Sequence, residues 1–298
     1  MKQFVGVKLK KSKLFGCLLV LISTFGLACI LFMMFGYDKF IRPYLFVLPD
    51  SISLVDYPNA LPLFPAFTTN NVSGFNNLGY FTQCSNILTD LYILSLGLSI
   101  LGVKKAQKFG FNKYFAGGAT MFIAITGIVY CCGMLPFIDK AATTWVKEFP
   151  ALAMIDFLGY WHHICLPIIM LALWYLPFSN EELEVKKFVK TASIFPVVYS
   201  VLTVVRGICG GLHPTDITGM ANAKTWWPYP FLAPDRISPY VKGLFGNTNP
   251  TLDIVCTIIC YVLVGIVLFV TPILLAKIHN KYIKHLNSKY TFLENNIK

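Results

Sequence analysis

The chain has 298 residues, of which 56% are hydrophobic and only 13% are charged. A soluble domain carries about 25% charged residues, so the composition excludes an ordinary soluble protein and predicts an all-α integral membrane protein. The net charge is +11, but the basic residues lie mainly between apolar runs, so we expect contacts to membrane lipids and no nucleic acid as partner. The nine cysteines form no Cys-x-x-Cys pair, and we predict neither a disulfide framework nor a metal or other cofactor.

Six mainly apolar runs have the length of a membrane-spanning helix, which needs about 20 residues to cross roughly 30 Å of hydrocarbon. They predict a single membrane domain, residues 1–298, built as a six-helix bundle. The predicted spans are residues 14–36, 78–103, 114–138, 157–178, 188–212 and 252–276. The predicted outer loops are residues 37–77, 139–156 and 213–251.

Basic residues are divided unequally between the two sides of the predicted bundle. Seventeen lysines lie in the N-terminus, the second and fourth connections and the C-terminal tail, against seven lysines and arginines in the outer loops. By the positive-inside rule, both termini are expected in the cytoplasm. The chain shows no internal repeat, which counts against a transporter built from inverted repeats. Its heavy use of Lys, Asn, Ile and Phe suggests an AT-rich bacterial genome, so we expect a bacterial plasma membrane.

The second predicted span carries many polar residues, in the stretch YFTQCSNILTDLY. Thr82, Asn86 and Asp90 are spaced four residues apart, so on a helix they share one face. Polar groups at membrane depth are costly unless they face the bundle interior or a wet cavity. Asp90 has the strongest need of a partner, because a carboxylate in this position must be paired or protonated. His163 and Arg206 are the partners that we expect.

Two other predicted spans place polar groups in the same outer half of the membrane. His162 and His163 lie about two turns into the fourth span, and Arg206 lies near the outer end of the fifth. The last outer loop, which contains Tyr229 within WWPYPF, begins on the same side. Because three spans bring polar groups to one depth, we predict a hydrated pocket that opens outward.

These residue types together suggest acyl-transfer chemistry. A hydroxyl becomes a nucleophile when a base, usually histidine, removes its proton, so Thr82 or Ser85 would attack. Arg206 and Asn86 would hold the oxyanion or the substrate, with Ser85 and Tyr229 as further binding residues. Each group also has a packing interpretation, because hydroxyls and histidines in spans bridge helices and an arginine can reach the headgroups.

Four segments resemble, in order and spacing, an integral-membrane hydrolase family. They are YFTQCSN, WHHICLP, VVYSVLTVVRG and WWPYPFLAP, and the resemblance covers roughly residues 78–235. The family contains the androgen-induced and androgen-dependent transmembrane hydrolases of animals, together with bacterial relatives, to which the chain looks most similar. The animal members hydrolyse fatty acid esters of hydroxy fatty acids, using a threonine nucleophile and a histidine. The resemblance therefore implies a multi-span hydrolase of lipid-like esters.

The resemblance also assigns the catalytic pair. It implies Thr82 as the nucleophile. The histidine is His163, counted four residues before Pro167, or His162, counted five, and the bacterial spacing favours His163. A more distant acyltransferase relative uses cysteine, which makes Cys84 an alternative, although two residues from Thr82 it points away from that face.

The chain departs from the family's pattern at one position. An acid precedes the tryptophan that follows the histidine segment in the bacterial relatives, whereas Leu173 precedes Trp174 here. The departure leaves Asp90 or Asp156 as the acid that would orient the histidine.

Three functions remain open from the sequence. The favoured one is a membrane-embedded hydrolase of fatty-acyl esters, in which His163 would act as general base and then as acid. The second is a lipid or small-anion binding or transport protein that uses the same pocket without catalysis. The third is a structural membrane protein whose polar residues lock the helix packing.

Overall fold

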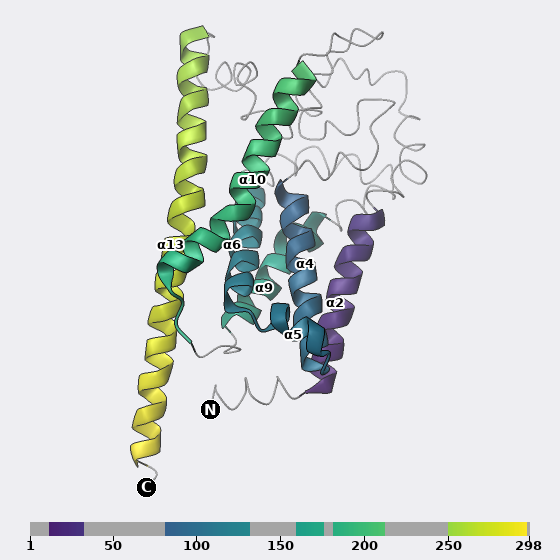
Figure 1. Cartoon of the computed structure of the whole chain (residues 1–298), viewed down its shortest axis with the longest axis vertical. Helices are drawn as coiled ribbons and strands as arrows, with labels where there is room; N and C mark the ends of the chain where they lie inside the picture. Colours follow the sequence, from purple (N-terminus) through teal and green to yellow (C-terminus); the bar gives the residue numbers. More distant parts are fainter. Residues whose placement is uncertain (1–11, 33–80, 132–158, 176–180, 212–249, 297–298) are drawn as a thin grey trace. The chain divides into compact units, whose positions relative to one another are not determined.

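The structure, a computed structural model, describes residues 12–32, 81–131, 159–175, 181–211 and 250–296. Within these ranges every regular element is a helix, which confirms the all-α prediction. The helices are α2 (Lys13–Leu31), α4 (Phe81–Ile100), α5 (Lys104–Gly110), α6 (Lys113–Val129), η5 (Trp161–Cys165), α9 (Leu166–Tyr175), α10 (Val185–Gly211) and α13 (Pro250–Asn296) (Figure 1).

Three of the described helices are long and apolar enough to cross a membrane. They cover Lys13–Leu31 in α2, Val185–Val205 in α10 and Tyr261–Ser288 in α13, and they mark the chain as a membrane protein. These helices correspond to the first, fifth and sixth predicted spans. α4 has 20 residues, but its polar residues make it less apolar than these three helices. α6 has only 17 residues, which is shorter than the three helices. The described part of the fourth predicted span, Trp161–Tyr175, is apolar but short.

The helix that contains the last predicted span, residues 252–276, continues far beyond it. α13 is one helix of 47 residues, which at about 1.5 Å per residue is roughly 70 Å long and more than twice the thickness of the hydrocarbon layer. The sequence after Ala276 contains no glycine or proline to end the helix. The basic tail is therefore the continuation of this helix and not a separate segment.

The described helices fall into two compact units. The first unit contains α2, α4 from Cys84, α5, α6, η5, α9, α10 to Ile194 and α13 from Phe269. The second unit contains the start of α4 and the remaining parts of α10 and α13. In the second unit the ring of Phe81 packs against those of Phe195 and Tyr199, each with a centroid separation of 5.3 Å. The expectation of a single domain remains a prediction.

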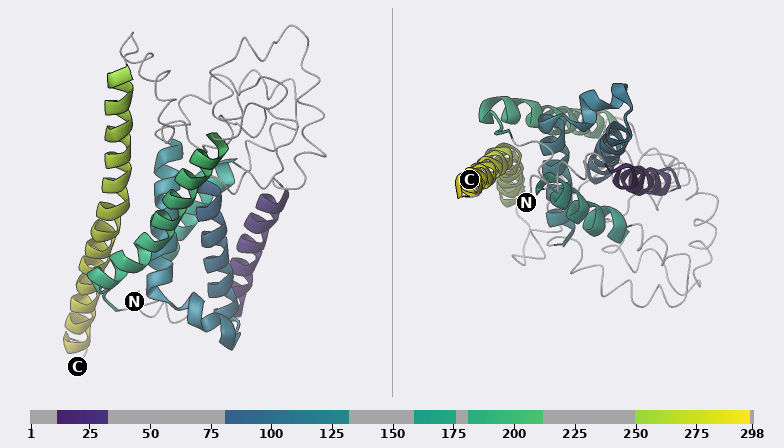
Figure 2. Two further views of the ribbon diagram at one scale, coloured as in Figure 1. Left: turned by 45° about the horizontal axis from the view of Figure 1, so that its top comes forward. Right: turned by 90° about the horizontal axis from the view of Figure 1, so that it is seen from below.

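Within the first unit, α2 packs on α4 through glycines. A Cβ added to Gly97 would lie 2.9 Å from the carbonyl oxygen of Gly16, and one added to Gly16 would lie 3.1 Å from that of Gly97. Small residues at both positions let the two backbones approach closely, as in membrane helix pairs. The two helices lie side by side in Figure 2. The opposite face of α2 carries exposed Leu14 and Leu21, as a lipid-facing surface would.

The core of the first unit lies where α6 packs against α4 and α9. Leu96, Met121 and Met170, one from each of these helices, have no exposed surface. Gly127 of α6 lies against the ring of Pro167 at the start of α9, where an added Cβ would be 3.2 Å away. This close approach brings the end of α6 next to η5, the segment that carries both candidate histidines.

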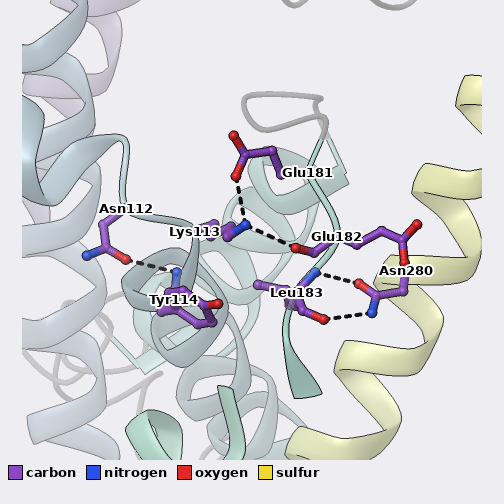
Figure 3. A network of polar contacts seen from close by, with 7 residues as sticks. All are labelled: Asn112, Lys113, Tyr114, Glu181, Glu182, Leu183 and Asn280. Atoms are coloured by element: carbon purple, nitrogen blue, oxygen red, sulfur yellow. Dashed lines mark hydrogen bonds and ion pairs between the residues drawn. The ribbon is translucent and has the colours of Figure 1, made fainter. Parts of the chain in front are cut away.

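A polar clamp joins α13 to the segment that precedes α10. The Nδ2 of Asn280 donates to the carbonyl oxygen of Leu183 at 2.8 Å, and its Oδ1 accepts from the Leu183 N–H at 2.7 Å (Figure 3). Lys113, the first residue of α6, forms a 2.7 Å ion pair with Glu181 and donates to the carbonyl oxygen of Glu182 at 3.0 Å. One residue on α13 therefore satisfies both backbone groups of a buried loop residue.

We expect Asn280→Ala to lower the free energy of unfolding by roughly 2–4 kcal/mol, because it leaves two backbone groups of the buried Leu183 without their side-chain partner. Chemical unfolding of the detergent-solubilised protein measures the change. Asn280→Asp keeps the acceptor for the N–H and should lose less. Lys281→Ala, at the exposed next position, is the control. Equal losses for Asn280→Ala and Lys281→Ala would show that the hydrogen bonds from Asn280 to Leu183 do not stabilise the folded protein.

Candidate functional site

Both candidate histidines lie in a π-helix, η5, that leads directly into α9. The N–H of Leu166 donates to the carbonyl oxygen of Trp161, five residues earlier, which widens the turn. Pro167 follows at once and has no N–H, so the regular ladder of hydrogen bonds is interrupted at this point. A π-turn changes the angle between successive side chains, and such turns are frequent at functional sites.

His163 is held by its own helix and by α6. Its Nδ1 lies 2.8 Å from the carbonyl oxygen of Gly159, and its ring stacks on Tyr130 with a centroid separation of 4.4 Å. A carbonyl oxygen only accepts hydrogen bonds, so Nδ1 must carry the proton that it donates. In the neutral ring, Nε2 then carries the lone pair, and no described residue hydrogen-bonds to it. His163 therefore presents a proton-accepting nitrogen.

His162 faces different helices. Its Nε2 lies 3.3 Å from the carbonyl oxygen of Gly26 in α2 and 3.9 Å from Oδ2 of Asp90 in α4. The side chain is buried, and next to it Trp161 meets Phe25 of α2 edge-on with ring centroids 4.9 Å apart. The two consecutive histidines thus have separate environments, His163 against α6 and His162 between α2 and α4.

The inner face of α4 contains both satisfied and unsatisfied polar groups. Ser85, Asn86, Thr89 and Asp90 have no exposed surface. The hydroxyl of Ser85 shares a 2.6 Å hydrogen bond with that of Thr126 in α6, and the hydroxyl of Thr89 donates to the Ser85 carbonyl oxygen at 2.8 Å. The amide of Asn86 and the carboxyl of Asp90 have no hydrogen-bond partner within the described residues. The hydroxyls of Ser85 and Thr89 thus have hydrogen-bond partners on α6 and α4, whereas the polar side-chain atoms of Asn86 and Asp90 have none within the described residues.

The carboxyl group of Asp90 lies directly against the backbone of α2. A Cβ added to Gly26 would overlap both of its oxygens and its Cγ. The same Gly26 offers its carbonyl oxygen to Nε2 of His162. Three helices therefore meet at this glycine.

The remaining predicted site residues are described to different degrees. Thr82 lies half-buried in the first turn of α4, on the same continuous helix as Asn86 and Asp90, and belongs to the second unit. Arg206 falls within α10, where only its backbone is described. Asp156 and Tyr229 lie outside the described residues. The pairing of Thr82 with a histidine therefore stays a prediction.

Two further positions follow from the same residues. Cys84 is half-buried in α4. Leu173, which stands where the related pattern has an acid, is buried, and the ring of Trp174 lies 4.4 Å from that of His279. Leu173 and Trp174 both belong to the core of the first unit. Within the described ranges no cluster of three or more His, Cys, Asp or Glu could bind a metal ion.

Three features of the site were not predicted from the sequence: the glycine against Asp90, the tyrosine that stacks on His163 and the π-turn that contains both histidines. Gly26 had a usable signal, because Gly16, Ser23 and Gly26 form a stripe of small buried residues on α2. Neither the contact of Tyr130 nor the π-turn had a signal in the sequence. A helical pattern does not show which residue of another helix a ring will contact, or where the backbone hydrogen bonds will change from α-helical to π-helical.

No known protein family, curated protein or solved structure matches the chain. The resemblance to the membrane hydrolases thus rests on the four sequence motifs.

Proposed function

We propose that the chain is a membrane-embedded hydrolase of lipid-like fatty-acyl esters, with six spans, both termini in the cytoplasm and a bacterial plasma membrane as its location. Three apolar helices support the membrane assignment, and α4, α6 and η5 with α9 would supply the other three spans. The unequal division of lysines supports the orientation. Membrane lipids are its surroundings, and a lipid-like ester is its substrate.

The observation that carries the proposal is the hydrogen bond from Nδ1 of His163 to the carbonyl oxygen of Gly159. In a Ser-His-Asp arrangement a carboxylate accepts this proton and so holds the imidazole in the tautomer whose Nε2 is the base. Here a backbone carbonyl performs the same task. An acid next to Trp174 is then not needed, and the buried Leu173 at that position is compatible with catalysis. The alternative orienting acid Asp90 lies beside His162.

In the proposed reaction the hydroxyl of Thr82 attacks the ester carbonyl carbon and gives its proton to Nε2 of His163. Arg206 and Asn86 stabilise the oxyanion of the tetrahedral intermediate. The intermediate collapses, and the alcohol leaves with the proton that His163 returns. Water then attacks the acyl-threonine, with His163 again as base, and releases the fatty acid. Ser85 and Tyr229 would contribute to substrate binding.

A fluorophosphonate probe, which reacts with activated hydroxyls, tests the proposal. We expect the purified wild-type protein and Thr82→Ser to be labelled and Thr82→Ala to remain unlabelled at equal folded yield, because only the alanine lacks a hydroxyl. Mass spectrometry of the labelled peptide locates the adduct. Equal labelling of Thr82→Ala and wild type would eliminate Thr82 as the nucleophile. Flux of lipid into proteoliposomes that survives Thr82→Ala would instead support a transport protein.

A further inference from the structure

The connection between α4 and α6 displays aromatic rings and lysines side by side. It contains the short helix α5, in which Lys104, Lys105 and Lys108 are exposed. Phe109, also in α5, is 52% exposed, and Phe111, just after it, is 40% exposed. We call these five residues the α5 surface. Phenylalanine is favoured where its ring leaves water, so the surface combines two apolar groups that gain from burial with three positive charges.

The α5 surface is held firmly against the end of α4. A Cβ added to Gly110 would overlap the carbonyl oxygen of Ser95 and the hydroxyl of Ser99, so α5 touches the last turns of α4. The chain turns into α5 at Gly102, whose φ of +97° favours glycine. It leaves α5 at Asn112, whose side chain accepts from two backbone N–H groups in the first turn of α6. The exposed side chains therefore extend from a fixed backbone.

This end of α4 lies level with one end of a membrane-crossing helix. α2 is long and apolar enough to cross a membrane, and Gly16 lies in its first turn. A Cβ added to Gly16 would lie 3.0 Å from Cγ of Leu101 and 3.1 Å from Cγ2 of Ile100, the residues that lead into α5. α5 lies at this end of α4 in Figure 1. The α5 surface is thus at the depth where the lipid headgroups begin.

The side chains are arranged around α5 in the order that this depth requires. At about 100° per residue, the three lysines lie on one side of the helix and Gly110, which touches α4, lies on the opposite side. Phe109 falls between these two sides. Its ring also meets that of Phe115 in α6 edge-on, with centroids 6.5 Å apart. The aromatic ring therefore lies nearer to the helix bundle, and the ammonium groups lie farther from it.

We propose that the α5 surface binds anionic phospholipids. The lysine ammonium groups donate to the headgroup phosphates, and the rings of Phe109 and Phe111 contact the upper acyl chains, as in other interfacial segments that combine lysines with apolar groups. The sequence has no Asp or Glu between Asp90 and Asp139, so this part of the chain carries charge of one sign. The orientation proposed above places the surface on the cytoplasmic leaflet, which is anionic. The proposal does not depend on hydrolase activity.

Crosslinking to lipid tests the proposal on the full-length protein. A benzophenone analogue of phenylalanine replaces Phe109, and the protein is reconstituted into vesicles of equimolar phosphatidylglycerol and phosphatidylcholine. After illumination, we expect mass spectrometry to find lipid adducts at this residue, with phosphatidylglycerol at least about fivefold over phosphatidylcholine, the factor that one lysine near an anionic surface contributes. The same analogue at Gln107, also exposed, repeats the measurement with both phenylalanines intact.

Two sets of lysines provide the matched comparison. Replacing the three lysines of α5 by glutamine should reduce the preference for phosphatidylglycerol to about one. Replacing Lys277, Lys281 and Lys284, which are exposed on α13, removes the same charge elsewhere and should leave the preference unchanged. The analogue at Leu21, on the lipid-facing side of α2, should give adducts of both lipids in equal amounts.

Four results would overturn the proposal. The first two are adducts to polypeptide instead of lipid, which would mean that protein covers the surface, and no adducts at either position, which would mean that water does. The others are equal adducts of the two lipids, and a preference that survives the loss of the α5 lysines. The last would assign the selection of lipid to other basic residues.

Discussion

Replacing His163 by glutamine should lower the turnover of a long-chain ester by about a thousandfold, within the range that general acid–base catalysis contributes. The glutamine amide can still donate a hydrogen bond to the carbonyl oxygen of Gly159, which accepts from His163 at 2.8 Å. It cannot accept a proton as imidazole Nε2 does. The substitution therefore removes the proposed base while it retains the local hydrogen bond. Steady-state kinetics in detergent micelles should show a lower kcat at little-changed KM.

The neighbouring histidine supplies the decisive comparison for this prediction. His162→Gln alters the group that faces Gly26 and Asp90, away from the carbonyl-bound ring of His163. We expect the loss of turnover to be larger for His163→Gln than for His162→Gln. The reverse order would assign the role of base to His162. His285→Gln, at an exposed position, controls for removal of a histidine as such.

Gly26→Ala should destabilise the protein by about 2 kcal/mol or more. An alanine in a helix interior gains about 1 kcal/mol over glycine in helix propensity, but here its methyl group would overlap both carboxyl oxygens of Asp90. Asp90 is short and fully buried, so the overlap is relieved only if α2 moves away from α4 or Asp90 leaves its rotamer. Overpacking of this kind costs about 1–3 kcal/mol or more, which outweighs the gain in propensity.

Gly118→Ala is the matched control for this prediction. Gly118 also lies buried in a helix, but a Cβ there would meet only the ring of Phe122, at an ordinary distance of 3.7 Å. We expect this variant to be as stable as the wild-type protein or up to about 1 kcal/mol more stable. Unfolding in denaturant, with both variants in the same detergent, measures the difference. A stable Gly26→Ala would show that α2 does not press on Asp90 in the folded protein.

Local pattern was sufficient for the helical architecture and for the polar face of α4. Apolar runs of about twenty residues identify α2 and the membrane-spanning parts of α10 and α13, because the hydrocarbon thickness sets the length of a span. The spacing of Thr82, Asn86 and Asp90 identifies one helix face, because the helical repeat does not depend on the rest of the chain. The last helix continues past residue 276, where the last predicted span ends, because hydropathy marks where lipid contact ends and not where a helix ends.

The partners of the polar residues required the tertiary structure. Ser85 and Asn86 are neighbours in sequence and both fully buried, yet Ser85 meets Thr126 across the helix interface while Asn86 has no partner within the described residues. Sequence spacing shows that both lie in the same turn of α4. It does not show which side chain of α6 stands opposite each one, because that depends on how the two helices pack.

The sequence by itself determined that this is an all-helical membrane protein and that its polar groups gather on a few helix faces, since both follow from hydropathy and from the period of the helix. Only the tertiary structure decided how His162 and His163 differ. Both lie in the π-turn η5, yet the ring of His162 meets Gly26 and Asp90 while the ring of His163 stacks on Tyr130. The spacing of residues in a helix predicts the direction in which each side chain points. The packing of the helices determines which residues of other helices that side chain contacts.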